Sequence, residues 1–123
     1  RNFSILAKSR TDSQVVFQLD PNADQWVAGT ILNLFTHRRY EGTSAEATQV
    51  FAVISPYVEL DAGDAAYDLY RRYPIVAGRL CYNELSDDAY LVPFTSIKSH
   101  FACQVQRVSS IQKECLLVLP LDK

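Results

Sequence analysis

Short apolar runs alternate with polar turns along the chain, and the runs are rich in β-branched and aromatic residues. Runs of this length predict β-strands, because amphipathic helices need apolar positions three or four residues apart over a longer stretch. We expect strands at residues 3–7, 14–19, 30–36, 48–55, 75–82, 90–93, 96–108 and 115–120. This pattern predicts a mainly β fold, either a small, strongly bent β-barrel or a sandwich.

The breaks between these runs carry residues typical of turns. The polar stretch 9–13 predicts a hairpin connection between the first two strands. Pro56 is expected to stop the strand before it, because proline donates no hydrogen bond to a ladder. Residues 60–73 predict one or two short helical turns, which Pro74 ends. Residues 83–86 predict an acidic turn element.

No internal repeat or linker divides the chain, so we expect a single domain over residues 1–123. A chain of this length is long enough to bury a real core. Alternate residues of 50–54 should face that core, together with Val105 and Leu117. The chain begins with Arg1 rather than Met, so we expect a domain excised from a larger protein.

Three cysteines, Cys81, Cys103 and Cys115, lie far apart in apolar stretches. An odd number at this spacing fits neither a disulfide framework nor a zinc site. Free cysteine behaves as a small hydrophobic residue in such surroundings. We therefore expect three buried thiols and an intracellular protein.

Composition and charge narrow the function classes. The net charge is −2, which argues against a domain that grips nucleic acid mainly by neutralising phosphates. Local basic patches remain at the arginine pairs 38–39 and 71–72. No apolar run approaches the roughly 20 residues of a membrane-spanning helix, and the layout of a signal peptide is missing. We expect no membrane partner.

Residues that could catalyse a reaction are sparse. The four glycines are scattered singly, which excludes a glycine-rich phosphate loop. His37 precedes an arginine pair, and His100 has apolar neighbours. A catalytic triad built on Cys103 and His100 would need an orienting carboxylate, and none lies near these two residues in the sequence. We expect no enzyme, no cofactor and no metal ion.

Aromatic and acidic residues give the better functional lead, because rigid rings are common in peptide-binding sites. Residues 61–70 interleave three aspartates with two tyrosines, which predicts an acidic, aromatic surface suited to a basic peptide such as a histone tail. The bland interpretations are a solvated helix face for the aspartates and a core position for the lone tryptophan. The candidate partner-binding residues are Trp26, Tyr57, Asp61, Asp64, Tyr67 and Tyr70.

Several short motifs follow one another in a recognisable order between about residues 27 and 108. A Gly-x-Ile strand stands at 29–34, a strand leading to a corner at 50–57, an Asn-Glu-Leu segment at 83–86, and Val-Pro with an Ile…Cys-x-Val strand at 92–105. This order resembles a BAH (bromo-adjacent homology) domain, a chromatin interaction module. The resemblance implies a BAH-like barrel that binds partners and catalyses nothing.

Members of that family that read methylated lysine place Trp and Tyr at the end of the central strand. Ile54, Ser55 and Pro56 stand at those positions here and offer no π faces to a quaternary ammonium. The resemblance therefore implies no aromatic cage of the usual kind. Residues 70–74 and 119–123 are also similar to BAH-like segments of transposon-derived proteins of mushroom-forming fungi, which implies a nuclear setting.

The sequence thus predicts a protein-interaction module in a chromatin- or transposon-associated protein. Two alternatives remain. A DNA-binding accessory domain would use the arginine pairs 38–39 and 71–72 on phosphates, and its affinity would fall steeply with salt. A structural module that packs on a neighbouring domain would expose a large apolar patch.

Overall fold

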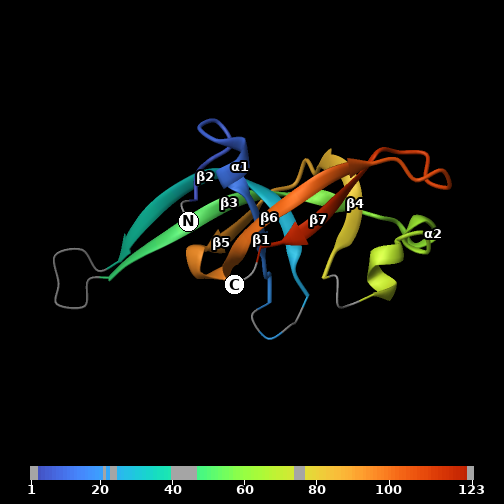
Figure 1. Cartoon of the computed structure of the whole chain (residues 1–123). Helices are drawn as coiled ribbons and strands as arrows, with labels where there is room; N and C mark the ends of the chain where they lie inside the picture. Colours follow the sequence, from blue (N-terminus) through green and yellow to red (C-terminus); the bar gives the residue numbers. More distant parts are fainter. Residues whose placement is uncertain (1–2, 21, 23–24, 40–46, 74–76, 122–123) are drawn as a thin grey trace.

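The computed structural model describes residues 3–20, 22, 25–39, 47–73 and 77–121. These residues form a mainly β structure with only short helices, as the sequence predicts (Figure 1). The strands are β1 (Gln14–Phe17), β2 (Val27–Arg39), β3 (Ala47–Glu59), β4 (Arg79–Leu85), β5 (Tyr90–Pro93), β6 (Ile97–Gln106) and β7 (Cys115–Pro120). The helices are α1 (Arg10–Ser13), α2 (Ala62–Ala65) and the 3-10 turns η1 (Leu69–Arg72) and η3 (Phe94–Ser96).

The sheet closes into a ring. Its strands follow the order β2-β1-β6-β7-β4-β3, and the last of these, β3, pairs with the first, β2. β5 pairs with β3 outside this ring. Every pairing is antiparallel. The far ends of β2 and β3 extend away from the ring, at the opposite end of the molecule from α2 (Figure 1). α2, in the segment between β3 and β4, therefore lies away from the extended ends of β2 and β3 (Figure 1).

β3 continues through Pro56, so the expectation that this residue ends the strand is wrong. β3 pairs with β5 up to Ile54 and with β4 from Tyr57 onward, so it changes its partner at this point. The Pro56 carbonyl accepts from the Ser86 N–H at 2.7 Å. In an antiparallel ladder the N and O of one residue face the same side. The missing N–H of Pro56 thus faces the junction between β5 and β4, where a proline is tolerated.

Gly29 lets β2 and β3 approach each other closely. A Cβ atom placed on Gly29 would lie 2.7 Å from the Ser55 carbonyl oxygen and 2.8 Å from Ile54 Cγ2. Both contacts are shorter than any ordinary carbon contact, so every other residue would push the two strands apart. This pairing closes the ring.

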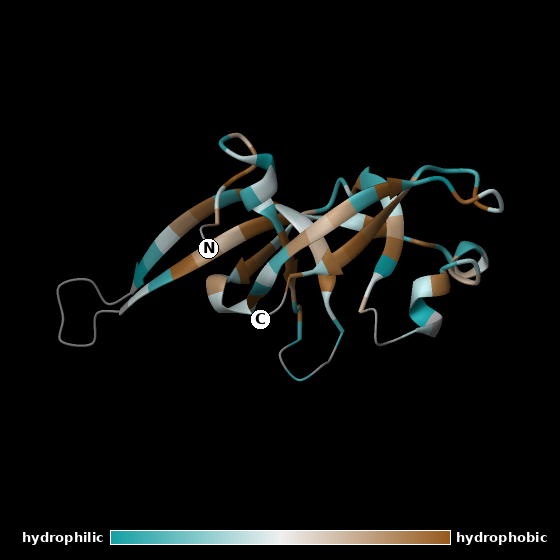
Figure 2. Ribbon diagram, in the orientation of Figure 1, coloured by the Kyte–Doolittle hydropathy of each residue, from teal (hydrophilic) through white to brown (hydrophobic). Residues whose placement is uncertain are grey.

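Three groups of buried side chains form the core, and apolar residues concentrate on the strands of the ring (Figure 2). Ala52 and Ile54 are fully buried, and Leu117 is 5% exposed. These positions confirm the alternation expected on the central strand and the core position of Leu117. Val50 is exposed, because it lies on the part of β3 that extends beyond the ring.

Two residues expected in the core lie at the surface. Val105 is 51% exposed, and Cys103 is exposed as well, so both expectations are wrong. β1 has four residues and pairs with β6 only over residues 97–100. Among the described strands, the later part of β6 has a neighbour on one side only, β7. The sequence of β6 alone does not reveal that β1, its second neighbour, ends before Cys103 and Val105, so these residues could not be recognised as exposed. Cys81 and Cys115 are buried as expected.

The N-terminal elements differ from the expectation. Residues 3–7 form no strand, and residues 9–13 form α1 and its cap rather than a hairpin connection. Ser9 caps the helix, because its side chain accepts from the Asp12 N–H at 3.2 Å. β1 finds its partners in β2 and β6 instead.

Other boundaries move by a few residues. The strand expected at 75–82 begins at Arg79 and continues to Leu85, so the acidic turn expected at 83–86 is mostly strand. Residues 75–76 and Pro74 lie outside the described residues. The helical turns expected within 60–73 are present as α2 and η1. None of the helices in the described part of the chain is long and apolar enough to span a membrane.

Substitution of Gly29 tests the close approach of β2 and β3. We expect Gly29→Val to lower the free energy of unfolding by about 1–3 kcal/mol, because the new side chain overlaps Ser55 and Ile54. Urea denaturation measures the change. Gly63→Ala is the matched control: its Cβ meets only Asp61 Oδ1 at 3.5 Å, so it should be neutral or stabilising. Equal stability of both variants would contradict the argument.

Thiol reactivity tests the placement of the cysteines. In the native protein one thiol, that of Cys103, should react quickly with an aromatic disulfide, while Cys81 and Cys115 should react slowly. Burial raises the pKa of Cys81 to about 12, so its reactive thiolate is scarce at neutral pH. Cys103→Ser should abolish the fast phase. A fast phase that persists in this variant would place a second thiol at the surface.

Candidate functional site

The segment between β3 and β4 carries most of the predicted partner-binding residues, and two aspartates shape it. Asp61 caps α2, since its Oδ1 accepts from the Asp64 N–H at 2.8 Å. Asp68 caps η1, since its Oδ1 accepts from the Tyr70 N–H at 3.1 Å. The two short helical turns therefore begin where the sequence places a capping side chain.

Asp68 does not belong to the exposed acidic surface that the sequence pattern predicts. Its side chain is fully buried. Its Oδ2 accepts from Arg71 Nε at 2.7 Å and from the Leu80 N–H of β4 at 3.0 Å. A buried carboxylate is tolerated when it is paired and hydrogen-bonded in this way. Asp68 thus anchors η1 to β4, and the interpretation of three equivalent surface aspartates is wrong.

Asp61 and Asp64 line a polar hollow together with Tyr82 and Lys113. The Tyr82 hydroxyl donates to Asp64 Oδ2 at 2.5 Å, and the Asp61 N–H donates to the same hydroxyl at 3.3 Å. The Lys113 ammonium lies 5.1 Å from the centre of the Tyr82 ring and 3.6 Å from Glu84 Oε1. The hollow therefore combines two carboxylates, an aromatic ring and a lysine of the chain itself.

Tyr67 and Tyr70 follow directly after this hollow. Tyr67 is 46% exposed, so its ring is open to a partner. Tyr70 is half-buried, and its hydroxyl accepts from Gln106 Nε2 at 3.0 Å. We call Asp61, Asp64, Tyr67 and Tyr70 the acidic–tyrosine surface. All four belong to the segment between β3 and β4, and Asp61 and Asp64 line the hollow.

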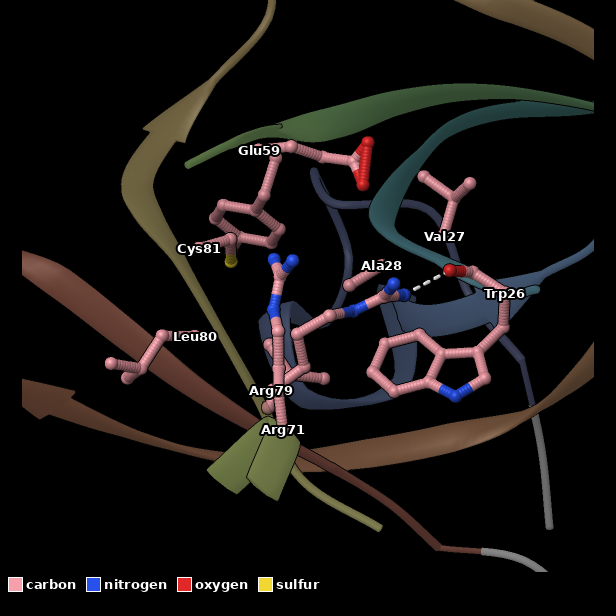
Figure 3. Close-up of a pocket in the computed structure, with 10 residues that line it drawn as sticks. Trp26, Val27, Ala28, Glu59, Arg71, Arg79, Leu80 and Cys81 are labelled. Atoms are coloured by element: carbon pink, nitrogen blue, oxygen red, sulfur yellow. Dashed lines mark hydrogen bonds between the residues drawn. The ribbon is translucent and has the colours of Figure 1, made fainter. Parts of the chain in front are cut away.

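Trp26 and Tyr57 lie elsewhere, around a pocket between the start of β2 and the start of β4 (Figure 3). The Arg79 guanidinium stacks over the Trp26 ring at 4.0 Å and donates to the Trp26 carbonyl oxygen. Burial lowers the pKa of Arg79 below its ordinary value, partly offset by Glu59. Tyr57 is 7% exposed and meets Phe101 edge to face at 6.1 Å. The six predicted residues therefore divide between two sites.

Sequence reasoning missed four residues of these sites. They are Glu59, Arg79, Tyr82 and Lys113. Only Arg79 leaves a signal: it follows a glycine inside an apolar run, where an arginine needs a partner for its charge. The other three have ordinary strand or loop contexts, and only the tertiary structure brings them to the sites.

The remaining candidates have structural surroundings. Ile54 is in the core, and the Ser55 hydroxyl donates to the Ser86 carbonyl oxygen at 2.8 Å. The His100 ring is buried and stacks on Phe3 at 4.2 Å. Within the described residues, no three His, Cys, Asp or Glu side chains gather in an arrangement that could hold a metal ion.

No protein-family model, curated protein or solved structure matches this chain. The BAH resemblance, the chromatin or transposon setting and the partner class therefore remain predictions from the sequence.

The contact between Tyr82 and Asp64 predicts a pH dependence of stability. The hydrogen bond to Asp64 raises the pKa of Tyr82 from 10.0 to about 12. The native state thus favours the protonated phenol, so the contribution is complete below pH 10 and is lost as the pH rises towards 12. We expect Tyr82→Phe to be less stable than the wild type below pH 10, with a difference that shrinks above it. Urea denaturation at several pH values measures the difference, and a constant difference would contradict the assignment.

Proposed function

We propose that this chain is a non-catalytic protein-interaction module that binds a basic peptide segment at the acidic–tyrosine surface. One observation carries the proposal. The hollow beside Asp61 and Asp64 already holds an ammonium group, that of Lys113, near the Tyr82 ring. The same carboxylates suit the lysine or arginine of a partner by charge complementarity, and Tyr67 of the same segment exposes a ring face for a cation–π contact.

We further propose that the ring of strands is a small, strongly bent β-barrel of the BAH type. The pairing of β3 with β2 supports closure, and the order of the sequence motifs supports the type. The setting that follows from this resemblance is a nuclear protein associated with chromatin or a transposon, and a histone tail is the basic partner to test.

The proposal includes no preference for methylated lysine. Arg79 already occupies a face of the Trp26 ring, and Tyr57 is nearly buried. Ile54 and Ser55 are also buried. These side chains offer no open group of ring faces to a quaternary ammonium.

One observation favours the alternative of a structural module. Apolar side chains line the outer face of the β2–β3–β5 sheet: Phe35 is 39% and Leu91 62% exposed, and their half-buried partners Phe51 and Val53 lie on the same face. Such a patch is typical of a surface that another domain covers. The DNA-binding alternative has less support, because the Arg71 side chain points into the pocket beside Trp26 and does not form an open basic surface for a duplex backbone (Figure 3).

Neutralising the two surface aspartates tests the proposed function. Asp61→Asn/Asp64→Asn keeps the cap of α2 and an oxygen acceptor for Tyr82, so the fold should persist. We expect affinity for a lysine- and arginine-rich histone-tail peptide to fall roughly threefold to tenfold, as two exposed ion pairs predict. Isothermal titration calorimetry measures the change.

The matched control is Asp87→Asn/Asp88→Asn, which removes the same charge from the exposed turn between β4 and β5. An equal loss in both variants would indicate general charge attraction and contradict the site. The trimethylated peptide should bind like the unmodified one, within about twofold. Tighter binding of a DNA duplex than of the peptide, with a steep salt dependence, would favour the DNA alternative.

A further inference from the structure

Two arginines reach into the pocket beside Trp26. Arg71 comes from η1 and Arg79 from the first residue of β4, and both guanidinium groups point into the same space (Figure 3). They are close enough for the charge of Arg71 to help lower the pKa of Arg79, after burial itself. The pocket therefore concentrates two cations, one of them largely removed from water.

Most of the N–H donors of these two groups have no protein acceptor. Arg79 donates to the Trp26 carbonyl oxygen, and Arg71 donates through Nε to Asp68 Oδ2. A guanidinium carries further donors in a planar fork. In the described part of the chain, no other hydrogen bond uses them. Arg71 is exposed and Arg79 half-buried, so the remaining donors of both groups stay accessible to a ligand.

Glu59 is the carboxylate at the rim of this pocket. Its side chain is exposed. Among the described residues no ion pair joins it to either guanidinium, although its charge partly offsets the burial of Arg79. The guanidinium groups of Arg71 and Arg79 thus have the Glu59 carboxylate near them but, within the described residues, form no ion pair with it. An oxyanion between them would make the charge-assisted hydrogen bonds that Glu59 does not make.

We propose that this pocket binds a terminal oxyanion, either a carboxylate or a phosphoryl group, between Arg71 and Arg79. Planar forks of arginine suit both groups, because two parallel N–H donors match two oxygens. The free volume is about 10 Å³, close to the space that one water molecule needs. This enclosed space admits one oxygen of a terminal group, and the rest of the group would lie at the open mouth of the pocket, beside the exposed Arg71. Glu59 competes with the ligand and sets its affinity.

The single tryptophan of the chain reports on this site directly, because Arg79 stacks on its ring. Inorganic phosphate and acetate are titrated separately into the full chain while chloride keeps the ionic strength constant. We expect a saturable change in Trp26 fluorescence with at least one of the two anions. Saturation with phosphate alone assigns a phosphoryl ligand, and saturation with acetate alone assigns a carboxylate.

Variants separate a binding role from a structural one. Glu59→Gln removes a repulsive charge from an exposed side chain, so the saturating anion should bind about threefold or more tightly than in the wild type. Arg79→Lys keeps the charge but loses the fork, so binding should weaken about tenfold. No saturable response to either anion in the wild type would overturn the proposal. So would an unchanged affinity in Glu59→Gln, which decides the matter even if Arg79→Lys fails to fold.

Discussion

The close pairing of β2 with β3 at Gly29 is the constraint on which the structure depends. A residue with a side chain at this position would meet the Ser55 carbonyl oxygen and the Ile54 side chain. The two strands would then separate where β3 leaves β5 and turns to β4. Closure of the ring brings β1, β6 and β7 into the same core, where Val16, Phe101 and Leu116 pack in one buried cluster.

Asp68 connects the segment that carries the candidate sites to the ring of strands. Its buried carboxylate accepts from Leu80 of β4 and from Arg71 of η1, so it fixes the middle of the segment after β3 to the ring. On one side of that point lie Asp61 and Asp64 with their hollow. On the other side Arg71 enters the pocket of Trp26. The buried charge of Asp68 is tolerated because three N–H donors bond to it, and removal of Arg71 would leave this carboxylate without its counter-charge.

The two sites have opposite character, although they share one connecting segment. The acidic–tyrosine surface offers carboxylates and a ring, while the pocket offers two guanidinium groups. The net charge of −2 does not reveal this separation, because it sums the charges of the whole chain, both sites included. The sequence-based argument for a basic partner therefore describes only one face of the molecule. The same segment contributes Arg71 to a site that suits an anion.

The sequence by itself determined the class of the fold, the positions of most strands and the helical turns within residues 60–73, because periodicity and local propensity act over neighbouring positions. It also placed four of its six candidate residues in one segment. Only the tertiary structure decided which strands are neighbours, and hence that Pro56 lies within a strand and Cys103 at the surface. It likewise decided that Asp68 is buried while Asp61 is exposed. Burial depends on pairing between residues far apart in the chain, which no local pattern encodes.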